Sequence, residues 1–214
     1  MPLTVTSQRE QALADELAAL VRLGVRAPYI FTAGTIEPRK DLATIVDAFE
    51  RVRARHRSLS LVIAGRAGWL PNSAQAWLLS RPGITRLGHV SDADLDVLYR
   101  HADAFVAASI YEGFNLTVLE ALAHGCPAIV SLIPAHREVA GDAARYFRPG
   151  DVHLLVDNIY ELIRDRGTRA QLGQAGIRRA ELYDVDSAIR GHLAAYKQAV
   201  REPRLSHSWS RPST

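Results

Sequence analysis

Two glutamates, Glu112 and Glu120, bracket the stretch of the chain whose residue types most clearly predict chemistry. Between them lie a glycine-containing turn and the apolar start of a helix, in the order Gly-Phe-Asn-Leu-Thr-Val-Leu. The free N–H groups at the start of a helix attract phosphate, and carboxylates accept hydrogen bonds from hydroxyl groups. Phosphates and hydroxyls on one ligand describe a nucleotide or a nucleotide-sugar.

Two basic residues, Arg39 and Lys40, stand in a second polar segment, Gly34-Thr-Ile-Glu-Pro-Arg-Lys40. A guanidinium group can grip phosphate oxygens bidentately, and an ammonium group supplies a point charge. Basic residues at a helix start oppose the helix dipole, which favours an anion as their partner. The simpler alternative is that this segment only begins a helix before Asp41. Glycines at Gly34 and Gly113 would let the backbone approach a ligand closely.

Glu120 has mainly apolar neighbours, since only Thr117 and His124 among the residues within four positions are polar. A helix that is apolar all round is buried, and a buried carboxylate without partners is costly. Ribose hydroxyls would supply such partners. The alternative is an exposed glutamate near a helix start, stabilised by the dipole, and the spacing leaves both interpretations open.

Alternating strand and helix patterns must position these residues. They predict an α/β fold: a single Rossmann-like, doubly wound parallel sheet of about six strands, with helices on both faces and extra helices at the C-terminal end. The expected strands are 29–33, 59–64, 84–87, 104–109, 127–131 and a short sixth at 145–147. The expected helices are 41–55, 73–80, one capped by Ser91, one from about Asn115 to Gly125, and helices only from Val152 to about Glu202.

In such sheets ligands bind outside the carboxyl ends of the strands, where the strand order reverses. The unusual polar segments follow the first four expected strands, at 34–40, 65–68, 88–91 and 109–115. With the strand order 3-2-1-4-5-6, the first and fourth strands are neighbours. The loop with Arg39 and Lys40 then faces Glu112 and the helix start at Asn115.

Composition narrows the class of protein. The 214 residues carry a net charge of +3, with 48% hydrophobic and 23% charged residues, as in an ordinary soluble domain. The arginines of 51–55 fit a solvated helix face better than a nucleic-acid groove. The single cysteine, Cys126, fits a small buried filler in a reducing compartment, and no Cys or His spacing suggests a metal. Without a signal peptide or a membrane-spanning run, a cytoplasmic location is expected, at most peripheral at the inner face of the membrane.

The chain is expected to divide into three parts. Residues 1–27 form a helical lead-in, residues 28–202 form the Rossmann-like domain, and residues 203–214, rich in Pro, Ser and Arg, form a disordered tail.

Several motifs in order resemble the C-terminal, donor-binding half of a GT-B glycosyltransferase of the retaining family 4, the group 1 family. The resemblance covers about residues 28–200 and depends on the motifs at 34–42, 112–122, 125–131, 138–144 and 149–151. It implies a UDP- or GDP-sugar as donor, with no metal or other cofactor.

The resemblance also implies roles for single residues. Arg39 and Lys40 would hold the diphosphate and stabilise it as it leaves, and Glu112 would contact the transferred sugar near its anomeric centre. Glu120 would bind the ribose hydroxyls, and the loop 88–90 would lie near the base. The implied donor-binding residues are Gly34, Thr35, Gly65, His89, Val90, Gly113, Phe114, Asn115, Leu116, Thr117 and Glu120.

The chain departs from the family pattern in three ways. Thr35 stands where many relatives have arginine, a loss for which Arg39 is expected to compensate. Thr117 stands where proline is common, and Asn115 is expected to act as the helix cap there. Only one of the two domains of a GT-B enzyme is present. The acceptor, a glycan or lipid-linked glycan in surface polysaccharide or glycoconjugate synthesis, would therefore need a missing N-terminal domain or a partner chain, and the chain alone would bind donor but be inactive or nearly so.

Three other functions were weighed against this hypothesis. A non-catalytic nucleotide-sugar-binding or regulatory subunit, and half of a GT-B nucleotide-sugar epimerase, remain alternatives. A dinucleotide-dependent oxidoreductase is disfavoured, because no Gly-x-Gly-x-x-Gly follows Ala33 and the second strand ends in Gly65 and Arg66 rather than in an acid.

Overall fold

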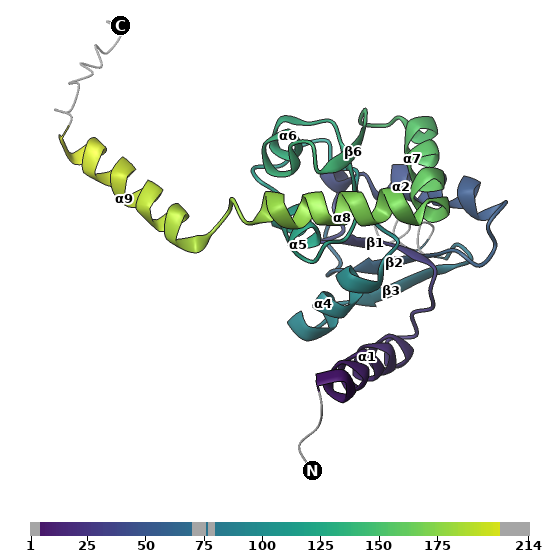
Figure 1. Cartoon of the computed structure of the whole chain (residues 1–214). Coiled ribbons are helices and arrows are strands. Elements are labelled where there is room, and N and C mark those ends of the chain that lie inside the picture. Colours follow the sequence, from purple (N-terminus) through teal and green to yellow (C-terminus); the bar gives the residue numbers. More distant parts are fainter. Residues whose placement is uncertain (1–4, 70–75, 77–79, 202–214) are drawn as a thin grey trace, which may run out of the picture. The chain divides into compact units, whose positions relative to one another are not determined.

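The computed structural model describes residues 5–69, 76 and 80–201, shown in Figure 1. The chain forms two compact units, residues 1–181 and 182–214. The first unit contains the sheet and its helices, and the second contains helix α9 (Val185–Arg201). The helix expected at 73–80 falls largely outside the described residues, as does the tail expected at 203–214.

Six parallel strands form one sheet in the order β3-β2-β1-β4-β5-β6, which confirms the predicted doubly wound topology. The strand order reverses between β1 and β4, where Ile30 lies opposite Ala104 and Phe31 opposite Phe105. The carboxyl ends of these two strands are therefore the predicted place for a ligand. The strands are β1 (Tyr29–Ala33), β2 (Ser60–Ala64), β3 (Ile84–Gly88), β4 (Ala104–Ala107), β5 (Ala128–Ser131) and β6 (Ala144–Phe147).

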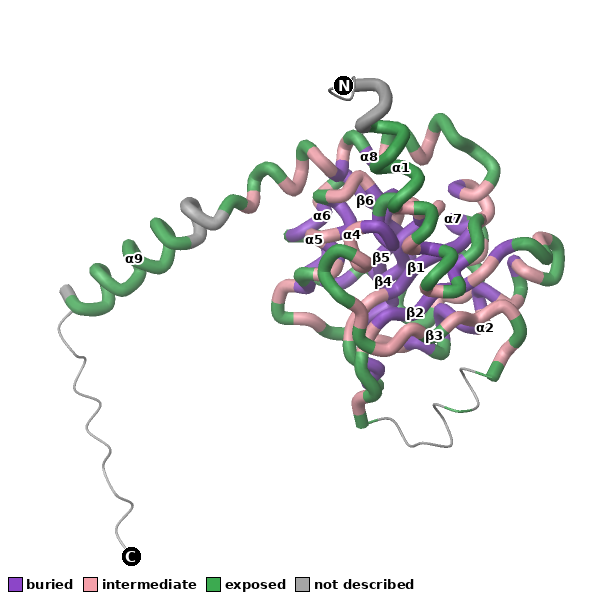
Figure 2. The backbone as a smooth tube through the Cα atoms, turned by 90° about the horizontal axis from the view of Figure 1, so that it is seen from below, coloured by how far each residue is buried: buried purple, intermediate pink, exposed green. Residues whose placement is uncertain are grey.

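Successive residues of the central strands contribute to two different hydrophobic cores, because side chains of a strand alternate between its two faces. Phe31 and Phe105 belong to one core and Ile30 and Val106 to the other. This explains why the strands are almost continuously apolar, and Figure 2 shows the buried residues concentrated in them.

Helices cover both faces of the sheet, as predicted. Helices α2 (Leu42–Arg53) and α7 (Val152–Arg164) pack on one core. Helices α1 (Val5–Arg22), α4 (Asp92–His101), α5 (Leu116–Ala123) and α6 (Pro134–Ala140) contribute to the other, and α8 (Arg166–Ala180) packs against α5. None of the described helices is long and apolar enough to cross a membrane.

The lead-in helix α1 is fastened to α4 by ion pairs. The carboxylate of Glu16 pairs with Arg100 at 2.6 Å and with His101 at 2.8 Å. Arg22 at the end of α1 pairs with Asp94, which also meets the hydroxyl of its helix cap, Ser91, at 2.8 Å. The lead-in is thus a docked part of the first unit.

Strand β4 ends at Ala107, two residues earlier than expected. Ala108 and Ser109 remain buried but leave the ladder, because the chain turns to bring the amide of Ile110 to the carbonyl of Arg39, at 2.8 Å. The burial of both residues without strand pairing explains why the strand end was predicted too late. The turn joins the two loops that carry the predicted site.

Candidate functional site

The loops after β1 and β4 meet at the carboxyl end of the sheet and bring three charged residues together. The Lys40 Nζ lies 2.7 Å from Glu112 Oε1, and Arg39 pairs with the other oxygen of the same carboxylate. Only 7% of the Glu112 side chain is exposed, against 38% for Arg39 and 19% for Lys40. The three residues predicted to act on the sugar and diphosphate therefore form one cluster, called the cationic cluster after Arg39 and Lys40.

Burial raises the pKa of Glu112, but hydrogen bonds from Lys40 and Ser109 and the positive charge of Lys40 outweigh it, so that the pKa lies below its usual value. Glu112 is therefore an ionised carboxylate held between two cations. Ser109 is fully buried and donates to Glu112 Oε1 at 2.8 Å. Ser109 begins the polar segment 109–115, but it was not predicted as a partner of Glu112.

A second carboxylate, Glu37, belongs to this cluster and was not predicted. It is only 4% exposed and pairs with the guanidinium group of Arg39. Arg39 is thus held between Glu37 and Glu112, both of which fix its direction. The sequence signal was present, because Glu37 stands in the same Glu-Pro-Arg-Lys segment.

The segment Pro38–Lys40 forms a short 3-10 helix and α2 begins only at Leu42, with Asp41 as its cap.

Helix α5 begins in an unusual way. Asn115 occupies the cap position with φ 79°, and its side chain does not bond to the N–H groups of the helix. The expectation of a side-chain cap is therefore wrong. Asn115 instead accepts from the Thr117 hydroxyl and donates to His136, both at 2.8 Å. Asparagine is favoured here because it tolerates the left-handed conformation better than other non-glycine residues. The first N–H groups of α5 lack intrahelical acceptors, and this side chain does not satisfy them.

A cavity of about 230 Å³ opens beside this helix start. Six of the predicted donor-binding residues line it: Gly34, Gly65, His89, Val90, Thr117 and Glu120. The rest of the lining is Ala33, Ala64, Gly88, Asp92 and Leu95. Segments from the ends of β1, β2 and β3 and from α5 therefore share one cavity, as the sheet topology predicts.

Gly65 is required by the protein's own backbone. It has φ +145°, and a Cβ atom there would lie 1.9 Å from the carbonyl oxygen of Gly34. The glycine thus lets the ends of β1 and β2 approach each other at the cavity wall, whether or not a ligand touches it.

Glu120 lies on the cavity wall, half-buried, with a partner from the protein. The Tyr99 hydroxyl donates to Glu120 Oε2 at 3.0 Å, and the hydroxyl oxygen also lies 3.2 Å from the Thr117 carbonyl. Burial, and then the charge of Glu120, raise the pKa of Tyr99, which keeps this hydroxyl a donor. Neither prediction from the sequence was complete, because Glu120 is neither exposed nor without a partner. Tyr99 carried no signal, since it lies on another helix.

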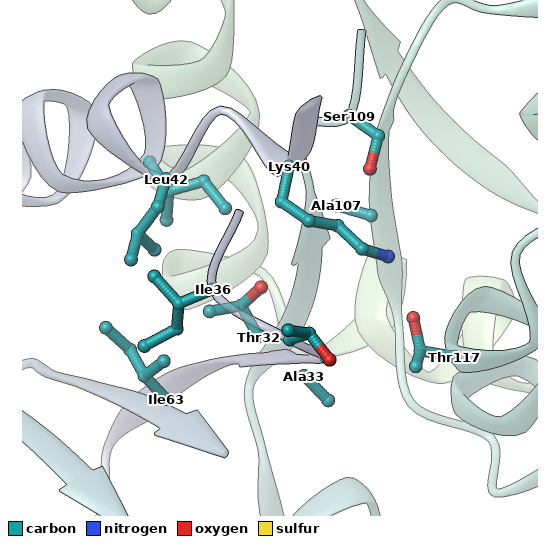
Figure 3. Close-up of a pocket in the computed structure, with 12 residues that line it drawn as sticks. Thr32, Ala33, Ile36, Lys40, Leu42, Ile63, Ala107, Ser109 and Thr117 are labelled. Atoms are coloured by element: carbon teal, nitrogen blue, oxygen red, sulfur yellow. The ribbon is translucent and has the colours of Figure 1, made fainter. Parts of the chain in front are cut away.

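A second, small cavity of about 20 Å³ adjoins the first and shares Ala33, Gly34 and Thr117 with it. Lys40 extends over this cavity with its amino group on the side of Ser109 and Thr117, above a floor that includes Ile36 and Ile63 (Figure 3). Thr35 also lines it. Lys40 thus places one member of the cluster at the small cavity, which adjoins the larger one.

Neither cavity is lined by four of the predicted donor-binding residues, Gly113, Phe114, Asn115 and Leu116, nor by Arg39 and Glu112. Leu116 is 63% exposed, and a Cβ atom at Gly113 would meet open space. Phe114 packs partly against the hydrophobic core.

Within the described residues, no group of three or more His, Cys, Asp or Glu side chains is arranged to hold a metal ion. Cys126 is buried, as expected, and burial raises the pKa of its thiol, which favours the protonated form.

Two curated proteins have sequences similar to that of this chain, at 30–32% identity. The O-antigen chain mannosyltransferase B of Escherichia coli is 32% identical over 175 residues, which are 79% of this chain and 45% of that protein. The MMP alpha-(1->4)-mannosyltransferase of Mycolicibacterium hassiacum is 30% identical over 184 residues, 82% of this chain and 44% of that protein. The chain thus spans less than half the length of these two relatives.

Solved structures share the fold. A protein of Anabaena, HepE, solved with UDP and glucose, superposes with a TM-score of 0.75 over 87% of this chain and 52% of its own, at 18% identity. The C-terminal domain of a glycosyl transferase group 1 family protein from Francisella tularensis gives 0.65 over 72% of this chain and 85% of its own, at 24% identity. The fold is thus that of the C-terminal domain of a GT-B glycosyltransferase.

The sequence model of one family, described as glycosyl transferases group 1, matches residues 16–179, which include the end of helix α1, the whole sheet and every residue of the cationic cluster. The chain belongs to the glycosyl transferases group 1 family.

Proposed function

We propose that this chain is the donor-binding half of a retaining glycosyltransferase and that it binds a nucleoside-diphosphate sugar at the carboxyl end of its sheet. One observation carries the proposal: Arg39 and Lys40 converge at the point where the strand order reverses, next to a cavity with Glu120 on its wall. Cations beside a carboxylate-lined cavity match the phosphates and hydroxyls of one ligand.

The diphosphate binds to Arg39, Lys40 and the first N–H groups of α5. Glu112 and Glu37 already pair with these cations, but a guanidinium has five N–H donors and an ammonium three. Both cations therefore keep capacity for phosphate oxygens. As the bond to the sugar breaks, negative charge grows on the diphosphate, and these fixed positive groups stabilise it without a metal.

The ribose binds to Glu120 and the base lies near His89 and Val90. Tyr99 occupies only one of about four acceptor positions on the Glu120 carboxylate. Its fixed hydroxyl orients the carboxylate toward the cavity. Glu112 contacts the transferred sugar, since it is the carboxylate closest to the two cations that hold the diphosphate.

The rest of the enzyme supplies the acceptor, a glycan or lipid-linked glycan of a surface polysaccharide or glycoconjugate. The chain spans less than half of the two relatives compared above, which supports a site completed by an N-terminal domain or a partner chain. Their names favour a mannosyl donor, so that GDP and UDP are the nucleotides to compare. The donor domain, expected at residues 28–202, ends within the first unit, which closes at Glu181, so helix α9 is not part of it. Its place is the cytoplasm, at most peripheral at the inner face of the membrane.

Calorimetric titration of the 214-residue chain with UDP and GDP tests the proposal. We expect saturable binding of one molecule of at least one of the two, and little or no sugar transfer by the chain alone. A folded protein that binds neither nucleotide at millimolar concentration would contradict it. Restored transfer on addition of a chain carrying the N-terminal domain of a relative would separate half of an enzyme from a regulatory subunit.

A further inference from the structure

A buried histidine, His136, lies behind the start of α5 and belongs to no role assigned above. It is fully buried on α6, directly after the carboxyl end of β5. Burial lowers the pKa of its imidazole ring, and the ring is therefore neutral. A neutral imidazole has one nitrogen that donates and one that accepts.

The hydrogen bonds of His136 decide which nitrogen carries the proton. Its Nδ1 lies 2.8 Å from the carbonyl oxygen of Ser131, which can only accept, so Nδ1 carries the proton. Its Nε2 is consequently bare and accepts from the Asn115 side-chain amide at 2.8 Å. The carbonyl side of that amide, Oδ1, then faces the Thr117 hydroxyl, which donates to it at 2.8 Å.

This series of contacts leads to the cavities in one direction and to the cationic cluster in the other. Thr117 lines both cavities. In the other direction, the Ser131 hydroxyl lies 3.1 Å from His136 Nδ1 and donates to the carbonyl of Ser109. Ser109 in turn donates to Glu112. His136 therefore connects the start of α5 with the carboxylate of the cationic cluster.

We propose that His136 is a positioning residue: by accepting from Asn115 it holds the left-handed start of α5, and with it Thr117 and the first N–H groups, in place for the diphosphate of a nucleoside-diphosphate ligand. The inference rests on the proposed function. Asn115 is held in a conformation that is rare for side-chain-bearing residues and its side chain does not cap the helix, so its two side-chain partners fix the geometry.

Two substitutions separate the bonds of His136. In His136→Gln the side-chain oxygen can reach the place of Nε2 and accept from Asn115, while the bond to Ser131 is lost. In His136→Asn the amide can replace Nδ1–H and donate to Ser131, while Asn115 loses its acceptor. Both variants lose one buried hydrogen bond, and we expect similar losses of thermal stability.

The affinities are expected to differ. His136→Gln should bind UDP or GDP, whichever the parent chain binds more tightly, within about threefold of the parent, and His136→Asn about tenfold more weakly, the effect of one buried hydrogen bond. Equal affinities in the two variants would overturn the inference. A parent chain that binds neither nucleotide would instead overturn the proposed function.

A matched control and a second measurement keep the test independent of stability. Asn158 is 8% exposed and donates to the Tyr146 carbonyl at 3.1 Å, on α7 and outside both cavities. Asn158→Ala should lower thermal stability without changing nucleotide affinity. Should neither His136 variant fold, the nitrogen NMR signals of His136 in the parent chain decide: a protonated Nδ1 and bare Nε2 support the inference, and a protonated Nε2 overturns it.

Discussion

Lys40 and Glu112 meet at 2.7 Å, although they lie on loops that follow different strands of the sheet. The contact exists because β1 and β4 are neighbours at the point where the strand order reverses. An ammonium group and a carboxylate in contact form a pair that a phosphate can enter by competing for the cation. The pair therefore connects the topology of the sheet to the proposed chemistry.

Glu112→Gln should strengthen the binding of a free nucleoside diphosphate. The substitution removes a negative charge beside the expected phosphate site and leaves Arg39 and Lys40 in place, so we expect a gain of about 1 kcal/mol, on the order of one net hydrogen bond. Calorimetry with UDP or GDP measures the change. Glu161→Gln, which alters an ion pair with Arg145 on another part of the surface, should have no effect. Weaker binding in Glu112→Gln would show that the carboxylate assists the phosphate instead.

Lys40→Ala should weaken the same nucleotide by about 1.5–3 kcal/mol, or roughly 10- to 100-fold, because a charged hydrogen bond to phosphate is lost. The chain has one other lysine, Lys197, which is exposed on α9. Lys197→Ala removes the same charge and serves as the matched control. Comparable losses in the two variants would point to the net charge of the protein and not to a phosphate site.

Glu120→Ala should weaken nucleotide binding by about 1–3 kcal/mol because the ribose hydroxyls lose their acceptor. The matched comparison uses a nucleotide without the 2′ and 3′ hydroxyls. If Glu120 binds the ribose, the parent chain should prefer the ribonucleotide, and Glu120→Ala should lose this preference. An unchanged preference in the variant would assign the ribose to other residues.

The doubly wound sheet could be predicted from local patterns, and the meeting of the two loops followed once the common strand order 3-2-1-4-5-6 was assumed, which the structure has. Apolar strands alternate with helices, parallel sheets bury both faces, and connections are right-handed. The polar segments after the first and fourth strands then had to lie at one edge of the sheet. Their residue types, with Arg39 and Lys40 on one side and Glu112 on the other, completed that part of the site.

Partners contributed by distant elements could not be predicted. Tyr99 on α4 bonds to Glu120, and His136 on α6 bonds to Asn115. Such contacts depend on how helices pack against the sheet, and neither hydrophobic periodicity nor turn chemistry encodes them. The left-handed start of α5 was missed for the same reason, since its side-chain partners come from Thr117 and from another helix.

The docking of α1 on α4 should weaken at acid pH. A hydrogen bond from His101, opposed by burial and supported by Arg100, lowers the pKa of Glu16. A carboxyl group whose pKa is lower in the folded state stabilises that state at pH values above the pKa of the unfolded chain, about 4.3. This stabilisation is lost as the pH falls through the pKa of the folded state. Intrinsic amide exchange slows as the pH falls, so the expected sign is a loss of protection: exchange of α1 should slow less than the intrinsic rate between about pH 6 and 3. Glu16→Gln should remove that extra pH dependence, and an unchanged profile in the variant would assign it to another group.

Gly65→Ala should disrupt the carboxyl edge of the sheet, because its Cβ atom would lie 1.9 Å from the Gly34 carbonyl oxygen, at a φ of +145° that side-chain-bearing residues rarely adopt. Neither neighbour can move without separating β1 from β2, since the Gly34 amide bonds to the Ala64 carbonyl at 2.9 Å. We expect a loss above about 3 kcal/mol in the free energy of unfolding, measured with urea. Gly150→Ala is the matched control: its φ is also positive, +77°, but its Cβ atom would meet open space, so only about 1 kcal/mol should be lost. Similar losses in the two variants would mean that the approach of the two strand ends contributes nothing beyond the backbone conformation.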